Sequence, residues 1–166
     1  MLFRSSVIEA VLTDKPYPVR AMYISGVNIV VTYPDAARTI EAMKSLDFIA
    51  VATQNLNPTS ACADIVLPKT TTLEEEEVQL ILGGPCIGYT NPVLRPRGEA
   101  RSDLDIALDL RDRLLARKAL TQDFLPWENQ RAFNEFLLGD SGITIEALQA
   151  RGFATFPYEL GAFEET

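Results

Sequence analysis

Two short runs of apolar and β-favouring residues near the start of the chain have the length of buried strands. They cover residues 19–25 and 48–52, and a glycine-containing segment follows the first run and a polar segment follows the second. Between the two runs, Pro34-Asp35 precedes residues 36–44, in which apolar residues recur at helical spacing. A strand, a helix and a strand in this order form a βαβ unit, whose right-handed crossover makes the strands parallel neighbours. The pattern therefore predicts an α/β fold.

Further elements are predicted on either side of this unit. Residues 1–15 have a loosely amphipathic pattern that ends before Pro16, because proline disfavours a helical residue in front of it. After a polar loop at residues 53–59, the compact apolar run at residues 64–68 ends in proline and predicts a third strand. No clear periodicity follows residue 152. The other expected elements are a helical turn at 60–63, a strand at 78–82, an extended connection rich in proline and glycine at 85–98, a helix at 103–117 capped by Ser102, and helices at 127–138 and 145–151.

Composition and charge narrow the classes of partner. Hydrophobic residues make up 47% of the chain and charged residues 23%, a balance typical of a folded globular protein. The formal net charge is −8 and no compact basic patch is present, so few Lys or Arg residues are available to displace counterions from a nucleic acid. The longest apolar runs are far shorter than the roughly 20 residues of a membrane-spanning helix. We therefore expect neither nucleic-acid binding nor direct insertion into a membrane.

The side-chain inventory disfavours a metal site or a proton shuttle formed by this chain. Histidine is absent, and Cys62 and Cys86 are too far apart for a CxxC site. Each cysteine has apolar or small neighbours and is expected to be a core residue rather than a nucleophile. The acidic block at residues 74–77 is expected to be a solvated face, as most runs of like charge are. We therefore expect no catalytic residue and no metal ligand in this chain.

Two loops after predicted parallel strands are candidate ligand-binding segments, because ligands of open parallel sheets bind beyond the carboxyl ends of the strands. Gly26 would permit close approach of the backbone, and Asn28 offers an amide to a ribose or phosphate. Residues 53–59 carry amides and hydroxyls that could bind the edge of a purine. Each loop also has a simpler interpretation, as a tight turn capped by Asn28 and as an Asn-Pro turn that satisfies its own backbone.

The order of short motifs along the chain is more specific than any single motif. The series consists of Ser25-Gly26-Val27-Asn28, Leu46-Asp47-Phe48, Asn57-Pro58-Thr59, Ala63-Asp64-Ile65-Val66-Leu67-Pro68, Leu73-Glu74, Pro96 and Gly98-Glu99-Ala100-Arg101-Ser102-Asp103. It resembles the molybdopterin oxidoreductases related to dimethyl sulfoxide reductase. The resemblance is clear over residues 16–117, is looser beyond them, and is most distinctive at residues 64–68.

The resemblance implies a Rossmann-like three-layer domain with a mainly parallel sheet over residues 1–118, followed by a helical extension and tail at 119–166. In this family the matching domain binds one of two molybdopterin guanine dinucleotides, which carry molybdenum or tungsten, and the guanosine end lies over these loops. The loops and the resemblance together give the candidate cofactor-binding residues Gly26, Asn28, Thr53, Asn57, Thr59 and Asp103. Of these, Asn28 matches a nucleotide-contacting Asn of the family, and Asp103 matches an acidic residue that reaches the dinucleotide.

Two positions depart from the family pattern. Thr53 stands where the family usually has an acidic residue, and a threonine cannot accept two hydrogen bonds from a guanine N–H pair as a carboxylate does. Glu75 stands where some members have a lysine. Binding of the guanine base is therefore the less secure part of the expectation, whereas Thr59 keeps the hydroxyl that many members have.

Family members are several times longer than this chain. They have an N-terminal domain that holds an iron–sulfur cluster or a related domain, a segment that supplies the protein ligand of the metal, and a C-terminal cap. We therefore expect a part of an oxidoreductase catalytic subunit, inactive alone, whose partners are the remaining domains of that subunit and an iron–sulfur subunit. Substrate, metal and compartment would be determined outside this segment. The alternatives are a non-catalytic α/β interaction module that has lost cofactor binding and a free-standing nucleotide-binding domain.

Overall fold

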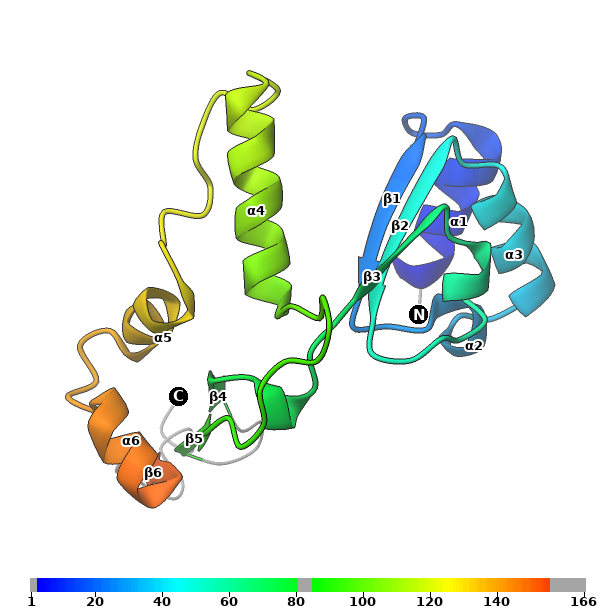
Figure 1. The fold of residues 1–166 in the computed structure, drawn as a ribbon. Helices are drawn as coiled ribbons and strands as arrows, with labels where there is room; N and C mark the ends of the chain where they lie inside the picture. The colour runs from blue at the N-terminus through cyan, green and yellow to red at the C-terminus, as the bar shows by residue number, and fades with distance from the viewer. Residues whose placement is uncertain (1–2, 81–84, 156–166) are drawn as a thin grey trace, which may run out of the picture. The chain divides into compact units, whose positions relative to one another are not determined.

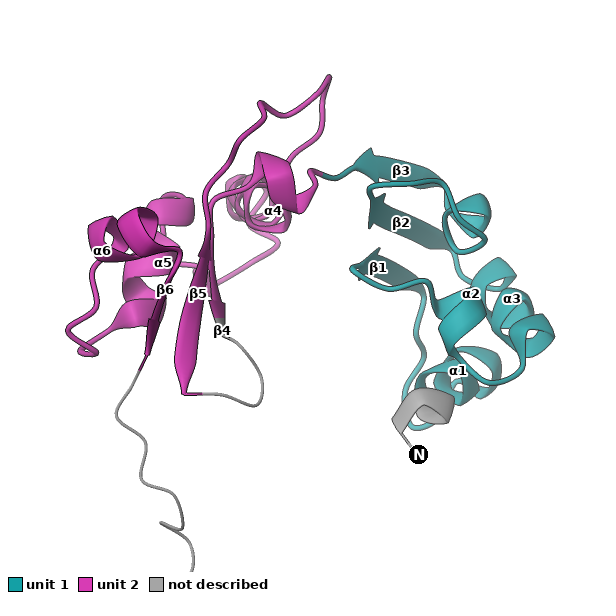
Figure 2. Cartoon of the chain, turned by 90° about the horizontal axis from the view of Figure 1, so that it is seen from below, with its two compact units in different colours: residues 1–69 teal, residues 70–166 magenta. Residues whose placement is uncertain are grey.

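The computed structural model describes residues 3–80 and 85–155 of the chain. The chain divides into two compact units between Lys69 and Thr70 (Figure 2). The boundary predicted from the sequence lies at residue 118, because the helix that begins at residue 103 is expected to belong with the parallel sheet. That helix belongs to the second unit. The assignment of residues 1–118 to one cofactor-binding domain stays a prediction.

The first unit is built around a three-stranded parallel sheet in the order β1-β2-β3 (Figure 1). Its elements are α1 (Phe3–Thr13), β1 (Ala21–Ser25), α2 (Ile29–Thr32), α3 (Ala36–Lys44), β2 (Phe48–Thr53), the single-turn η1 (Ser60–Cys62) and β3 (Ile65–Pro68). Strand β1 pairs in parallel with β2, and helix α3 lies between them in the sequence. The predicted βαβ unit and the α/β class are therefore confirmed.

Side chains of this sheet alternate between its two faces. Ile24 and Ile49 lie on the face covered by α1, α2 and α3, where they belong to the buried core of the unit (Figures 1 and 2). Tyr23, Ala50 and Ile65 are paired across the three strands on the opposite face, and Tyr23 and Ile65 are each 47% exposed. The helices of this unit therefore cover one face of the sheet, and the third layer of the predicted arrangement is not part of the unit.

The hydrogen bonds of Asp64 explain why an acidic residue begins the distinctive motif at residues 64–68. The Asp64 carboxylate Oδ2 accepts a hydrogen bond from the backbone N–H of Ile49 at 2.7 Å, and the Asp64 N–H donates to the Ile49 carbonyl at 2.9 Å. This pair of bonds ties the start of β3 to β2, because it satisfies backbone groups ahead of the first pair of the ladder. An acidic residue directly before the apolar strand thus helps to set the register of the sheet.

Helix α2 is an element that the sequence pattern did not indicate. All four of its residues, Ile29, Val30, Val31 and Thr32, are β-branched and have modest helix propensity. Ile29 and Val30 are buried in the core of the first unit. Tertiary packing therefore outweighs the local preference of this segment.

The second unit contains a separate antiparallel sheet in the order β4-β5-β6. The strands are β4 (Glu77–Leu80), β5 (Cys86–Thr90) and β6 (Phe153–Thr155). The expectation of an extended connection throughout residues 85–98 is wrong at β5, and β6 lies after residue 152, where the sequence shows no clear periodicity. Prolines and glycines near β5 hide its strand pattern in the sequence, and β6 is too short to show an alternating pattern. Residues 81–82 of the expected strand and residues 156–166 of the expected tail lie outside the described residues.

Three capped helices accompany this sheet. They are α4 (Asp103–Ala116), α5 (Gln130–Leu138) and α6 (Ile145–Arg151), and the single-turn η2 (Thr72–Glu74) precedes β4. The predicted cap of α4 is confirmed, because the Ser102 hydroxyl accepts a hydrogen bond from the Asp105 N–H at 3.1 Å. Helix α5 begins later than predicted, after Asn129, whose side chain accepts from the Ala132 N–H at 3.0 Å. Within residues 3–80 and 85–155, no helix is both long and apolar enough to cross a membrane.

The acidic block at residues 74–77 takes part in local structure. Glu74 closes a capping box, in which its Oε2 accepts from the Thr71 N–H at 2.8 Å and from the Thr71 hydroxyl at 3.0 Å. These bonds, with a smaller contribution from Arg97, hold the pKa of Glu74 below its ordinary value. Glu75 accepts a hydrogen bond from the Thr70 hydroxyl. In the part of the chain that the structure describes, no cluster of acidic or cysteine side chains is arranged to hold a metal ion.

Candidate functional site

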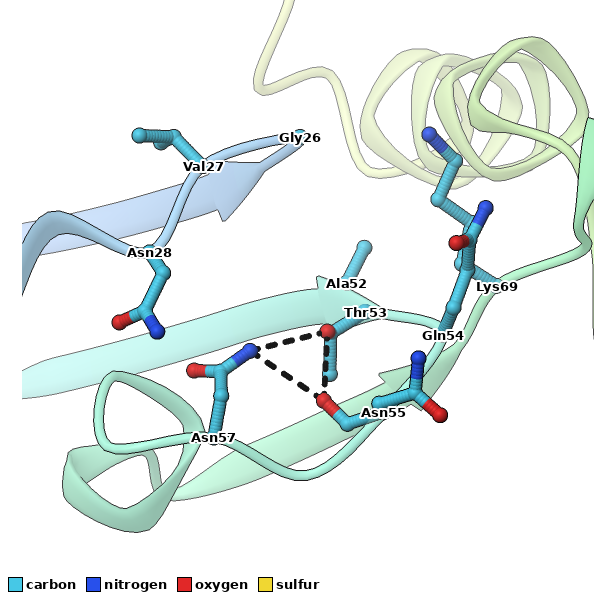
Figure 3. A pocket seen from close by; sticks show the side chains of 9 residues that line it. All are labelled: Gly26, Val27, Asn28, Ala52, Thr53, Gln54, Asn55, Asn57 and Lys69. Atoms are coloured by element: carbon cyan, nitrogen blue, oxygen red, sulfur yellow. Dashed lines mark hydrogen bonds between the residues drawn. The ribbon is translucent and has the colours of Figure 1, made fainter. Parts of the chain in front are cut away.

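A polar pocket of about 400 Å³ lies at the carboxyl ends of the parallel strands (Figure 3). The loop after β1 and the loop after β2 supply most of its lining. The residues that line it are Gly26, Val27, Asn28, Ala52, Thr53, Gln54, Asn55, Asn57 and Lys69. Gly26, Asn28, Thr53 and Asn57, four of the residues predicted from the sequence, are therefore brought together in one pocket. This is the edge of a parallel sheet where ligands generally bind.

Gly26 allows the chain to turn directly after β1. Its φ angle is +70°, in the left-handed region that glycine adopts at little cost and other residues rarely adopt. A Cβ at this position would meet no atom within 4 Å, so the requirement for glycine comes from the backbone conformation rather than from lack of space. The turn brings Asn28 to the wall of the pocket (Figure 3).

Thr59, in the loop after β2, forms hydrogen bonds with the segment that follows β1. Its side chain is fully buried, and its hydroxyl donates a hydrogen bond to Asn28 Oδ1 at 2.7 Å and accepts one from the Val30 N–H at 3.1 Å. Direct contact between Thr59 and a cofactor was expected from the sequence, but Thr59 is not among the lining residues. The geometry gives it a contact with Asn28 instead, which lines the pocket and is half-buried.

Asn57 organises the loop after β2. Its Oδ1 accepts hydrogen bonds from the N–H groups of Thr59 at 3.0 Å and Ser60 at 3.1 Å. Its Nδ2 donates to Thr53 Oγ1 at 3.1 Å and to the Asn55 carbonyl at 3.2 Å, and the Thr53 hydroxyl donates to the same carbonyl at 2.8 Å (Figure 3). The interpretation of this segment as a turn that satisfies its own backbone therefore holds for Asn57. The network also links Thr53, Asn55 and Asn57, all of which line the pocket.

The remaining lining residues give the pocket its electrostatic character. Lys69 is the one charged residue among the nine that line it. Gln54 and Asn55 are exposed and contribute side-chain amide groups. A pocket with an ammonium group and amides favours an anionic ligand or one rich in hydrogen-bond acceptors. Lys69 is not among the site residues predicted from the sequence. Its position directly after β3, at the end of a third parallel strand, was the signal that could have done so.

Asp103, the sixth predicted site residue, is the first residue of α4. It follows the cap Ser102 and lies in the first turn, where a carboxylate interacts favourably with the helix dipole. It belongs to the second unit, whereas the other five predicted residues belong to the first. Its contact with a cofactor stays a prediction.

Comparison with known proteins relates the chain to molybdopterin enzymes. The sequence pattern of the family described as molybdopterin oxidoreductase matches residues 3–113. The chain is 28% identical over 150 residues to the molybdopterin-containing subunit of thiosulfate reductase from Salmonella typhimurium, a match that covers 89% of this chain and 19% of that protein. It is 30% identical over 159 residues to the dimethyl sulfoxide/trimethylamine N-oxide reductase of Rhodobacter capsulatus, which covers 90% of this chain and 19% of that protein.

A solved structure shares the fold. Acetylene hydratase from Pelobacter acetylenicus matches 93% of this chain and 21% of its own chain with a TM-score of 0.79 and 24% sequence identity. The chain spans 19% of the length of the two curated relatives above. The family pattern matches well over half of the 166 residues. The chain therefore belongs to the molybdopterin oxidoreductase family.

Proposed function

We propose that the pocket at the ends of the parallel strands holds the nucleotide end of a molybdopterin guanine dinucleotide, as part of a larger oxidoreductase catalytic subunit. Family membership implies a molybdopterin cofactor with molybdenum or tungsten. The observation that carries the proposal is that one polar pocket is lined by Gly26, Asn28, the loop after β2 and Lys69. When bound, the cofactor supplies the redox chemistry, and the residues of this chain bind and orient its tail.

The chemistry of the lining fits the phosphate and ribose parts of such a tail. Lys69 offers an ammonium group to phosphate oxygens, and the Asn28 amide offers hydrogen-bond donors. Gln54 and Asn55 offer donors and acceptors to ribose hydroxyls or to the edge of a base.

Calorimetric titration of the purified chain with GDP tests this function. We expect saturable binding with a dissociation constant below about 1 mM, which corresponds to about −4 kcal/mol. Lys69→Gln should weaken binding about tenfold, because it removes a charge-assisted interaction with the phosphate oxygens. Lys44→Gln is the matched control, since it removes one positive charge at the exposed end of α3, outside the pocket lining. Absence of binding to the unchanged chain at millimolar GDP would contradict the proposed function.

The second candidate is a non-catalytic α/β module that has lost cofactor binding. The observation that favours it is the use of the Thr53 hydroxyl and the Asn57 amide within their own loop. In addition, none of the nine lining residues has a carboxylate to accept hydrogen bonds from a guanine. Absence of GDP binding in the titration would favour this second candidate over the proposed function.

We also propose that the exposed face of the β1-β2-β3 sheet contacts other parts of the parent catalytic subunit. Tyr23 and Ile65 are on this face, and so is Phe48, which is 42% exposed. The relatives that the chain matches are about five times as long, since it spans 19% of their length. An iron–sulfur subunit is the other proposed partner of the parent enzyme.

In the absence of those parts, we expect the chain to self-associate through this exposed face. Ile65→Lys should shift the sedimentation velocity distribution toward monomer, because a charge disfavours contact between two apolar surfaces. Val31→Lys is the control, since Val31 is 66% exposed on α2, away from this face of the sheet. Equal effects of the two substitutions, or a chain that is already monomeric, would argue against this surface as a contact.

A further inference from the structure

The buried Thr59 hydroxyl has a single proton and forms hydrogen bonds with two neighbours. The Val30 N–H donates to Thr59 Oγ1 at 3.1 Å, and a backbone N–H can only donate. The single hydroxyl proton is therefore available for the other neighbour, the Asn28 side chain, whose Oδ1 lies 2.7 Å away. Both bonds lie inside the protein, because the side chain of Thr59 is 0% exposed.

This arrangement determines which end of the Asn28 amide faces the pocket. If the amide were rotated by half a turn, Nδ2 would donate to Thr59 Oγ1, which already accepts from Val30, and the buried hydroxyl proton would lose this acceptor. In the observed orientation, the Thr59 hydroxyl both accepts from the Val30 N–H and donates to Asn28 Oδ1. This orientation leaves the Nδ2 group, which carries two donors, on the side of the amide away from Thr59.

We propose that Thr59 is a positioning residue that fixes the Asn28 amide with its Nδ2 donors toward the pocket, and that the pocket thereby selects an anionic oxygen acceptor such as a nucleotide phosphate. This inference rests on the proposed function, because it assumes that the pocket binds the nucleotide tail. Asn28 and Lys69 then present donors from the ends of β1 and β3, on opposite sides of β2 in the sheet. Thr59 contributes without touching the ligand, since it does not line the pocket.

The test compares substitutions at two fully buried threonines of the first unit. Thr59→Val keeps the shape but removes the hydroxyl, Thr59→Ser restores a hydroxyl, and Thr39→Val is the matched control. Thr39 is also 0% exposed, and its hydroxyl donates to the Asp35 carbonyl at 3.0 Å rather than to a pocket residue. The measurements on the full chain are GDP affinity by calorimetry and thermal unfolding.

We expect Thr59→Val to weaken GDP binding about tenfold, Thr59→Ser to stay within about twofold of the unchanged chain, and Thr39→Val to leave affinity unchanged despite a lower melting temperature. Unaltered affinity of folded Thr59→Val would overturn the positioning role while leaving the proposed function intact. A loss of affinity in Thr39→Val as large as in Thr59→Val would also overturn it, because general destabilisation would then explain the result.

A second measurement does not depend on the folding of any variant. In the unchanged, isotope-labelled chain, saturation with GDP should shift the NMR resonances of the Asn28 side-chain NH₂ group. Inorganic pyrophosphate should shift them in the same direction, whereas guanosine should not shift them. Unmoved Asn28 resonances in the GDP complex, or a response to guanosine alone, would contradict the proposal. If the unchanged chain binds neither GDP nor pyrophosphate, the proposed function and this inference both fail.

Discussion

Replacement of Ile49 by alanine should lower the free energy of unfolding by about 2–5 kcal/mol, the range for large-to-small substitutions in a packed core. Ile49 lies on the central strand β2, is 2% exposed and belongs to the core between the sheet and its helices. Its backbone also exchanges hydrogen bonds with Asp64 at the start of β3. A cavity here would therefore weaken the central strand of the sheet at the end opposite to the pocket loops.

The control for this prediction is Ile65→Ala, which deletes the same atoms from the edge strand β3. Ile65 is 47% exposed, so its loss should cost less than about 1 kcal/mol. Urea unfolding followed by circular dichroism measures both values, with the free energy assigned to the transition of the first unit. Similar costs for the two substitutions would show that the helix-covered face is not the main core of this unit.

Replacement of Asn28 by aspartate should weaken GDP binding about a hundredfold or more. The change removes both Nδ2 donors and places a carboxylate where we propose that a phosphate binds, so a favourable hydrogen bond is replaced by repulsion between like charges. A carboxylate oxygen can still accept from the Thr59 hydroxyl, as Oδ1 does at 2.7 Å, and the fold should therefore tolerate the substitution. Calorimetry with GDP measures the affinity, and thermal unfolding checks the fold.

The charge control for Asn28→Asp is Lys44→Gln, which also lowers the formal net charge by one. Lys44 is exposed and does not line the pocket, so this variant should bind GDP within about twofold of the unchanged chain. Near-normal binding by Asn28→Asp would exclude a phosphate from the vicinity of this side chain. An equal loss in Lys44→Gln would attribute the effect to net charge alone.

Much of the first unit could be predicted because its signals are local. The apolar runs of β1 and β2, the helix that starts after Asp35 and the turn at Gly26 each follow from a few consecutive residues. Strand β5 could not be predicted in the same way. It consists of five residues between a glycine-rich and a proline-rich segment, and it is stabilised by pairing with β4 and with the distant β6.

In the candidate site, several residues could be predicted from the sequence, but their roles could not. The sequence identified Gly26, Asn28, Thr53 and Asn57, because polar residues after parallel strands gather at one edge of a sheet. The burial of Thr59 could not be predicted, since a hydroxyl in a loop looks the same in the sequence whether it is buried or exposed. Only the structure shows that its partners are Asn28 and Val30.

By itself, the sequence of this protein determined the α/β class, the parallel order of β1 and β2, and the two loops from which a ligand site could be built. The tertiary structure decided that the chain divides at Lys69, that β5 and β6 form a second sheet, and that Lys69 joins the pocket lining. The physical reason is the range of the interactions. Periodicity, caps and turns act over a few residues, whereas the bond from Thr59 to Asn28 joins positions 31 residues apart and exists only after the core has brought their strands together.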